Sequence, residues 1–310
     1  MEGVNQPTNA SLSTMWAINN FPDLNDFFTT SRQLGFQKIE LNHQINSDML
    51  SRVHLDHYQF SSIHEPCPAD IATKVLVERD WMISSQDEIC RKHGVTAVKK
   101  SIGLAHELGA STVVIHCGNV STDMSSEIKL RLLFSAGKAQ TEEYQYFKSH
   151  FVQLRNNLAR PRLQAVKKSL RELIEYALQF NVKLGLENRY HYMDIPIIDE
   201  MEELLCLADP GRLGFIYDVG HAQALDRLGF FQHSEWLKRY STRIFGSHLH
   251  DVIGLSDHHA PGVGEIDFKS IANYLPEGSF RTFELQPGNT LAQVKQSLQI
   301  LVEAGCIRYI

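Results

Sequence analysis

The sequence predicts one (β/α)8 barrel, the TIM-barrel fold, and three observations lead to this expectation. Eight short β-like runs recur along the 310 residues. Several runs are almost continuously apolar, as parallel strands are when helices cover both faces of a sheet. Amphipathic segments with helical spacing lie between most of them. Strands that alternate with helices in this way favour a barrel, with an open doubly wound sheet as the alternative.

The predicted strands are separated by predicted helices along most of the chain. Apolar stripes at helical spacing run through residues 170–178, before the fifth strand, and through residues 291–301, after the eighth. Gly35 and Gly109 precede the second and fourth strands, where a helix commonly ends on a glycine with positive φ. In chain order the predicted strands are Ser11–Ala17, Gln37–Asn42, Gln59–His64, Ser111–Cys117, Val182–Asn188, Leu213–Val219, Ile244–His250 and Phe280–Gln286.

One interval is too long for a regular barrel. About 65 residues separate the fourth and fifth predicted strands, and residues 118–149 within this interval are polar and rich in Ser, Glu and Lys. We therefore predict a single domain over residues 1–310 with an insertion at about 118–149. The insertion would serve as a lid over the barrel mouth or as an oligomer contact, and the second option would make the protein a homo-oligomer.

The composition is that of a globular protein, with 43% hydrophobic and 21% charged residues. Thirty basic against 36 acidic side chains give a net charge of −6, which argues against nucleic acid and anionic membranes as partners. No apolar stretch approaches the ~18–20 residues that span a bilayer, and the polar start does not resemble a signal peptide, so we expect a cytoplasmic protein. The five cysteines form no CxxC pair and are expected to be free thiols.

Imidazoles and carboxylates gather where the predicted strands end. In a barrel the carboxyl ends of all strands face one mouth, where such enzymes carry out their chemistry. Seven of the 15 histidines lie at or just after these ends. Glu187 and Glu284 end apolar strands, where an unpaired carboxylate is costly to bury. The candidate groups are His64, His116, Glu187, Asp218, His221, His248, His250, Asp257, His259 and Glu284.

Side chains of these types bind divalent ions such as zinc and manganese. A single histidine at a strand end is more often a hydrogen-bonded structural residue than a ligand, but the number gathered here favours a metal site. Two arrangements stay open. Four groups could bind one ion while the others contact these ligands and the substrate, or the whole set could hold two or three ions.

Seven segments cover nearly the whole chain. They are GFQKIELN (35–42), SSIHEP (61–66), VVIHCG (113–118), LGLENR (184–189), YDVGHA (217–222), SHLHDVIGLSDHHAPGVGEIDF (247–268) and FELQP (283–287). In order and spacing they resemble the xylose isomerase-like TIM barrels, a family that includes endonuclease IV and ketose epimerases. The long segment that begins near HLHD is the most specific, and GFQKIELN is the weakest.

The resemblance implies which residues bind metal. In a single-ion sugar isomerase the ligands would be Glu187, Asp218, His248 and Glu284. His221 would lie near the substrate. Endonuclease IV has nine ligands, and the remaining positions of that set would be His64, His116, His221, Asp257 and His259. In HLHD the resemblance favours His248 over His250 as the ligand, and a shift of two residues stays open. The aromatic wedge that the nuclease inserts into DNA is replaced here by EPCPADIAT, which argues against nucleic acid.

We therefore expect a metal-dependent isomerase or epimerase that acts on a small sugar or sugar phosphate through an enediolate. The resemblance implies that Glu187 and Glu284 exchange protons with the substrate, with His221 beside them. Arg189 and His250 are expected to contact the substrate, although Arg189 could instead bridge to a neighbouring carboxylate. The alternatives are a multinuclear phosphoesterase and a metal- or sugar-binding barrel without activity.

Overall fold

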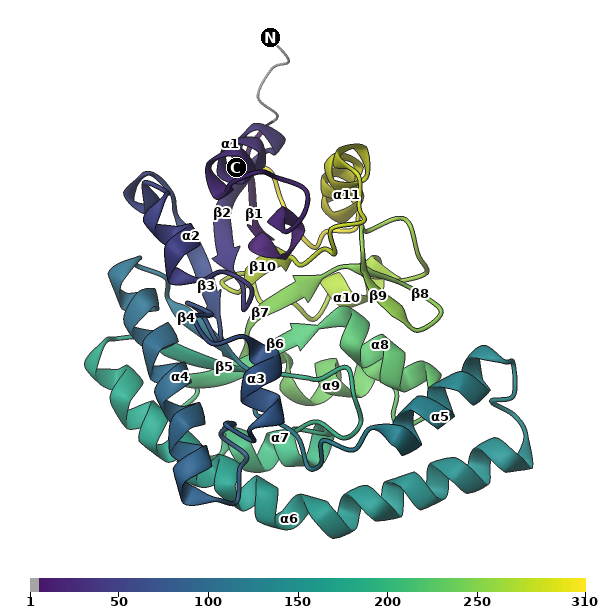
Figure 1. Cartoon of the computed structure of the whole chain (residues 1–310). Coiled ribbons are helices and arrows are strands. Elements are labelled where there is room, and N and C mark those ends of the chain that lie inside the picture. Colours follow the sequence, from purple (N-terminus) through teal and green to yellow (C-terminus); the bar gives the residue numbers. More distant parts are fainter. Residues whose placement is uncertain (1–5) are drawn as a thin grey trace.

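Eight parallel strands close into a barrel in the computed structural model, which describes residues 6–310 (Figure 1). Around the barrel the strands are hydrogen-bonded in the order β1, β10, β7, β6, β5, β4, β3, β2. The predicted fold class is confirmed, and the open sheet is excluded. The strands are β1 (Thr8–Ser13), β2 (Phe36–Leu41), β3 (Phe60–His64), β4 (Thr112–Ile115), β5 (Lys183–Glu187), β6 (Leu213–Asp218), β7 (Ile244–Leu249) and β10 (Phe280–Phe283).

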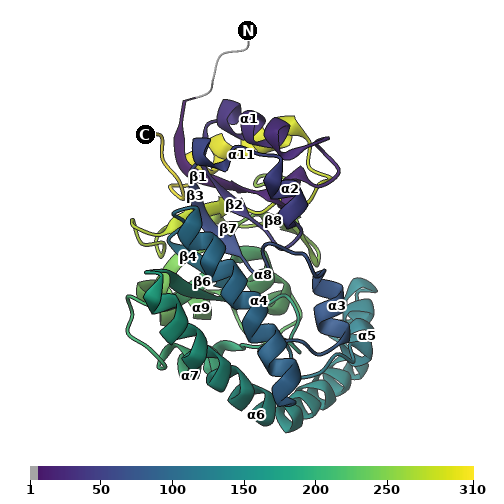
Figure 2. The ribbon, with the colours of Figure 1, turned by 60° about the vertical axis from the view of Figure 1, so that its left-hand side comes forward.

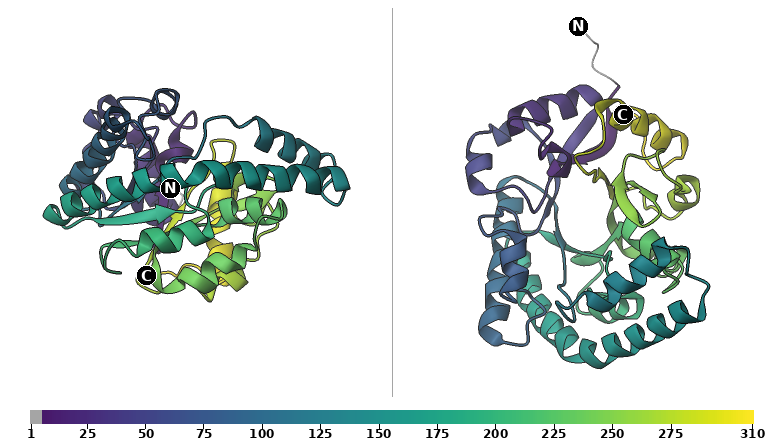
Figure 3. Two further views of the ribbon diagram at one scale, coloured as in Figure 1. Left: turned by 90° about the horizontal axis from the view of Figure 1, so that it is seen from below. Right: turned by 45° about the vertical axis from the view of Figure 1, so that its right-hand side comes forward.

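Helices cover the outside of the barrel. Figure 2 shows α4, which packs across β3 and β4, and Figure 3 (right) shows the ring of helices around the strands. Within residues 6–310, every helix is too short or too polar to cross a bilayer. The helices are α1 (Leu24–Leu34), α2 (Ser47–Ser51), α3 (Thr73–Glu78), α4 (Glu88–Glu107), α5 (Ser125–Ser135), α6 (Glu142–Gln179), α7 (Ile198–Leu205), α8 (Val219–Arg227), α9 (His233–Tyr240), α10 (Phe268–Ala272) and α11 (Leu291–Glu303), with short 3-10 turns η1 (Thr14–Ala17), η2 (Leu55–His57) and η3 (Ser241–Arg243).

Both glycines predicted to end helices have positive φ angles. Gly35 follows α1 with φ of 102° and donates its N–H to the carbonyls of Ser31 and Arg32. Gly109 lies just after α4 with φ of 68°. An L side chain adopts such angles at a cost, so glycine lets the chain turn at once toward the next strand.

The first and last barrel strands end earlier than the sequence predicts. β1 ends at Ser13, whose side chain accepts the N–H of Met15 and starts the turn η1. Trp16 is buried in that turn, and an apolar residue there resembles a further residue of the strand. β10 ends at Phe283, which places Glu284 just beyond the strand, at the mouth of the barrel.

A small antiparallel hairpin follows β7, where the sequence predicts a loop. It consists of β8 (Asp251–Ile253) and β9 (Ser256–His259). The carboxylate of Asp251 accepts the N–H groups of Val252, Gly262 and Ile266 at 2.9, 2.8 and 3.0 Å, which folds the following segment back onto the hairpin. The hairpin carries the histidines that follow Asp257 in the sequence.

The insertion predicted at 118–149 contains α5 and the start of α6. Helix α6 has 38 residues, so the insertion and the helix before β5 form one unit (Figure 3, left). On α5, the buried carboxylate of Glu127 accepts a hydrogen bond from Arg131 at 2.9 Å, and Arg131 donates to the carbonyl of Tyr190 at 2.7 Å. These contacts attach the insertion to the segment after β5, and its role as lid or oligomer contact stays a prediction.

Arg155 of α6 holds the segment after β5 against α7. Its guanidinium donates to the carbonyls of Tyr192 and Asp194 at 2.6 and 2.9 Å. It also donates to both carboxylate oxygens of Glu200, at 2.8 and 2.7 Å. Both side chains of this ion pair are buried, so the loss of either one leaves an uncompensated charge.

We expect Arg155→Ala to lower the free energy of unfolding by about 3–5 kcal/mol, because Glu200 is left buried and unpaired. The matched control is Arg160→Ala on the same helix. That arginine is exposed and lies 3.4 Å from Glu203, so its loss should cost less than about 1 kcal/mol. Urea unfolding measures both variants, and equal losses would contradict the role assigned to Arg155.

Candidate metal centre

Four buried side chains from four barrel strands meet at the mouth. Glu187 ends β5, Asp218 ends β6, His248 lies near the end of β7, and Glu284 follows β10. Each is at most 2% exposed. One ligand atom from each lies within 4.8 Å of the others, and we call this set the four-ligand group. It contains the residues that the resemblance implies for a single ion.

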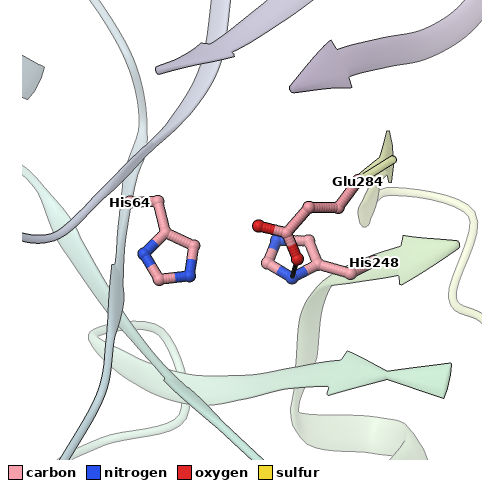
Figure 4. Close-up of side chains that lie close together, drawn as sticks. All are labelled: His64, His248 and Glu284. Carbon is pink, nitrogen blue, oxygen red and sulfur yellow. Dashed lines mark ion pairs between the residues drawn. The ribbon is translucent and has the colours of Figure 1, made fainter. Parts of the chain in front are cut away.

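His248 is turned so that its Nδ1 faces the carboxylates, and Figure 4 shows it beside Glu284. Its Nδ1 lies 2.7 Å from Oε1 of Glu187 and 3.1 Å from Oε2 of Glu284. Its Nε2 lies 3.2 Å from Oε2 of Glu40 on β2, and this oxygen also accepts the hydroxyl of Ser62 at 2.6 Å. A ring that donates from Nε2 to a carboxylate keeps a lone pair on Nδ1, and such pairs orient metal-binding imidazoles.

His250 supports Asp218 from the other side. Its Nε2 lies 3.0 Å from Oδ2 of Asp218, and its Nδ1 accepts the backbone N–H of His258 at 2.9 Å. Because Nδ1 accepts this N–H, the ring carries its proton on Nε2 and donates it to Asp218. Because both ring nitrogens have partners, the geometry orients His248, and not His250, into the four-ligand group.

The charges around the four-ligand group favour a cation at its centre. Burial raises the pKa of Glu187, but the imidazoles of His116 and His248 outweigh burial and hold it well below its usual value. Burial lowers the pKa of His248, yet the carboxylates of Glu284 and Glu40 raise it well above its usual value. The carboxylates are therefore ionised, and the centre stabilises a positive charge carried by a proton or a metal ion.

A second candidate group shares Glu187 and adds His64 and His116. Oε2 of Glu187 lies 2.8 Å from Nε2 of His116 and 3.9 Å from Nε2 of His64. The same oxygen accepts a hydrogen bond from Arg189, whose Nε lies 3.6 Å from Oδ2 of Asp194. Arg189 therefore bridges two carboxylates, and its charge lies beside the oxygen that a second ion would need.

A third candidate group consists of His221, Asp257 and His258. Nε2 of His221 and Nε2 of His258 each lie 3.7 Å from Oδ2 of Asp257. Nδ1 of His221 lies 3.0 Å from the carbonyl of Asn188. These contacts leave Nε2 of His221 directed toward Asp257, at the edge of the four-ligand group.

His259, a predicted ligand, is not brought into any candidate metal group among residues 6–310. Its Nε2 lies 2.8 Å from the hydroxyl of Ser256, and its Nδ1 lies 3.3 Å from the amide nitrogen of Gln286. Its neighbour His258 has a φ of 56°, which turns the His258 side chain toward Glu284. His258, and not His259, therefore belongs to candidate metal groups, and metal binding by either residue stays a prediction.

The residues of the four-ligand group fit a divalent ion. Two ligand atoms of this group, Nδ1 of His248 and Oε1 of Glu187, are among the described buried atoms that have no hydrogen-bond partner. The short distance between His248 and Glu187 joins two atoms that are not aligned for a hydrogen bond. Buried polar atoms are seldom left without a partner, and a zinc or manganese ion accepts both imidazole nitrogen and carboxylate oxygen.

Sequence reasoning did not single out Glu40, His43 or Glu65, which also lie here. The ring of His43 is 5.3 Å from that of His64, and burial together with the His64 charge lowers the pKa of His43 to about 4. Oε1 of Glu65 accepts the N–H of His116 at 3.0 Å, and burial raises the pKa of Glu65 to about 7. In the sequence, these residues are marked only as polar residues within or shortly after an apolar strand.

Comparisons with known proteins agree with this fold. A profile of the family described as xylose isomerase-like TIM barrel matches residues 29–301. An uncharacterized protein of Methanocaldococcus jannaschii is 26% identical over 200 residues, which are 63% of this chain and 56% of that relative. The chain thus spans little more than half the length of this curated relative.

Solved structures share the fold at low sequence identity. A D-tagatose 3-epimerase-like protein is 20% identical with a TM-score of 0.66, over 95% of this chain and 96% of the other. The IolI protein, solved with a bound zinc atom, is 17% identical with a TM-score of 0.63, over 95% of both chains. At these identities the likeness shows the fold alone. Because the family profile spans most of its length, this chain belongs to the xylose isomerase-like TIM barrel family.

Proposed function

We propose that this protein is a metal-dependent isomerase or epimerase that acts on a small polyhydroxy carbonyl compound through an enediolate. The observation that carries the proposal is the convergence of two glutamates on one cation site: Glu187 and Glu284 lie 2.7 and 3.1 Å from Nδ1 of His248. Two structural neighbours support the proposal. One is named a D-tagatose 3-epimerase-like protein, which supports the substrate class. The other was solved with a bound zinc atom, which supports the cofactor.

The four-ligand group would hold the ion, and its two glutamates would move protons. A divalent ion bound there supplies a Lewis acid that polarises a carbonyl and stabilises charge on adjacent oxygens. Glu187 and Glu284 come from strands on different sides of β7, since β6 separates β5 from β7 and β10 pairs with β7. One carboxylate can therefore remove the proton next to the carbonyl while the other returns one.

Three further residues contact the substrate or orient the ligands. We assign His221 to the substrate, because its Nε2 is directed toward Asp257 at the edge of the four-ligand group while its Nδ1 is held by the carbonyl of Asn188. His250 was predicted to contact the substrate, but both its nitrogens are engaged, so we assign it to orienting Asp218. Arg189 is 15% exposed at its side chain and can contact a substrate oxygen from beside Glu187.

Arg189 also favours one ion over several. A second ion bound by His64 and His116 would need Oε2 of Glu187, and this oxygen already accepts a hydrogen bond from Arg189. A guanidinium at that distance repels a second cation, because two like charges a few ångströms apart interact strongly in a buried site. The guanidinium thus supplies the positive charge that a second ion would bring.

A multinuclear phosphoesterase is the second candidate. It is favoured by two of the additional groups, since His64 with His116 and Glu187, and His221 with Asp257 and His258, could each hold an ion. Closely spaced ions can clamp the entering and leaving oxygens of a displacement. A barrel that binds an ion and sugars without turnover is the third outcome that the experiments below distinguish.

We expect the purified protein to contain one divalent ion per chain, and its removal by a chelator to lower the melting temperature, because the ion cross-links four strands. Arg189→Met should raise the content toward two ions, since Glu187 Oε2 becomes free. Arg227→Met is the matched control, because Arg227 pairs with the exposed carboxylate of Glu265 and not with Glu187. Elemental analysis gives the counts. Two or three ions in the unaltered protein would favour the phosphoesterase.

Adjacent histidines offer a matched pair of variants. His258→Ala should lower kcat by about tenfold or more, because the ring of His258 stacks on His250 at 4.2 Å and lies 2.9 Å from the carbonyl of Glu284. His259→Ala should change kcat by less than about twofold, since its contacts lie outside the candidate groups. A larger loss in His259→Ala would show that the nuclease-like pattern describes this site better.

Solvent exchange tests the proposed mechanism. In heavy water, with ketoses and aldoses offered with and without phosphate, the enzyme should place deuterium on the carbon next to the carbonyl. Glu187→Gln and Glu284→Gln should each abolish the exchange. Exchange that survives both substitutions would show that neither carboxylate is the base, and solvent oxygen in a released phosphate would identify a phosphoesterase.

A further inference from the structure

A cavity of about 140 Å³ opens beside the four-ligand group, between α3, α4 and the ends of β3 and β4. His116 and Arg189 line its inner end, and both also contact Glu187. The cavity therefore adjoins the proposed reaction site, and it shares these two side chains with the surroundings of Glu187. Its walls are mainly apolar and include Pro66, Leu76, Val77, Trp81, Met82 and Val98.

The cavity is held open by contacts that do not depend on a ligand. Gly94 of α4 lets the backbone of Met82 come close, since a Cβ at this glycine would lie 2.5 Å from the carbonyl carbon of Met82. The carbonyl of Ile83 accepts the hydroxyl of Ser169 at 2.8 Å. Trp81 stacks on His93 with ring centroids 4.1 Å apart. The walls are thus preformed, as they are in most small-molecule sites.

The lining also contains polar side chains. Glu65, His116, Arg189 and Asp194 are charged or titratable, and Thr73 and Asn119 are neutral. Oδ1 of Asn119 and Oγ1 of Thr73 are buried without a hydrogen-bond partner, and Asn119 is only 9% exposed. An amide oxygen can only accept, so a hydroxyl group on a ligand would supply the donor that Asn119 lacks.

The size of the cavity suits one six-membered ring. An engineered cavity of about 150 Å³ with apolar walls binds benzene. We propose that this cavity receives an aromatic ring carrying a hydroxyl group, so that the substrate is an aryl derivative of a polyhydroxy carbonyl compound and not a free sugar. This inference rests on the proposed function, because the reacting carbons would lie at the four-ligand group while the ring lies beyond His116 and Arg189.

Binding of phenol tests the cavity without any assumption about turnover. Ala97 lines the cavity and its neighbour Thr96 does not, so Ala97→Phe should fill the space and Thr96→Phe should not. We expect titration calorimetry to give phenol binding that is at least tenfold weaker in Ala97→Phe and unchanged in Thr96→Phe. Equal affinity in both variants would overturn the proposal.

The hydroxyl preference is tested separately. Asn119→Leu should weaken phenol binding about fivefold to tenfold and leave the binding of toluene unchanged, because only phenol donates to Oδ1. The ratio of the two affinities is insensitive to a general loosening of the fold. An unchanged ratio would overturn the assignment of Asn119.

The link to the reaction site is tested with 4-hydroxyphenyl β-D-glucopyranoside and methyl β-D-glucopyranoside on the metal-loaded protein. The hydroxyphenyl compound should bind at least tenfold more tightly, and Ala97→Phe should remove the difference. Equal binding of the two glycosides would overturn the inference, and solvent exchange with any ketose would then still support the proposed function. Tight binding of phenol with no solvent exchange from either plain or aryl-substituted ketoses would instead reject the proposed function and keep the cavity as an aryl-binding site.

Discussion

Three ionised carboxylates and one imidazole are buried together at the barrel mouth, and the rest of the site depends on this concentration of charge. Glu187, Asp218 and Glu284 come from β5, β6 and the end of β10, so their repulsion acts between barrel strands. His248, oriented by Glu40, and Arg189 offset part of this charge. A divalent ion would neutralise more of it and cross-link the strands that supply its ligands.

The barrel could be predicted because its determinants are local. Apolar runs indicate buried strands, and Gly35 and Gly109 indicate the turns that end helices. The ends of β1 and β10 and the β8–β9 hairpin could not be predicted in the same way. They depend on individual hydrogen bonds, such as Ser13 to Met15 and Asp251 to Gly262, which leave no periodic pattern in the sequence.

The four-ligand group was also predictable, since each member lies at or next to a strand end. The choice of His248 over His250 required the structure, because it depends on which ring nitrogens have partners. His258 lies in a candidate group and His259 does not, and this difference depends on a positive φ at His258 that the sequence does not indicate. Arg189 illustrates the same limit: the sequence left open whether it contacts substrate or a carboxylate, and the structure pairs it with Glu187.

We propose that one ion occupies the four-ligand group and that Arg189 takes the position of a second. Anomalous X-ray scattering at the zinc and manganese absorption edges locates bound ions. We expect one peak at about 2.0–2.2 Å from ligand atoms of Glu187, Asp218, His248 and Glu284, with Arg189 still on Glu187. A peak between His64 and His116, or one bound by His250, would show that this arrangement is wrong.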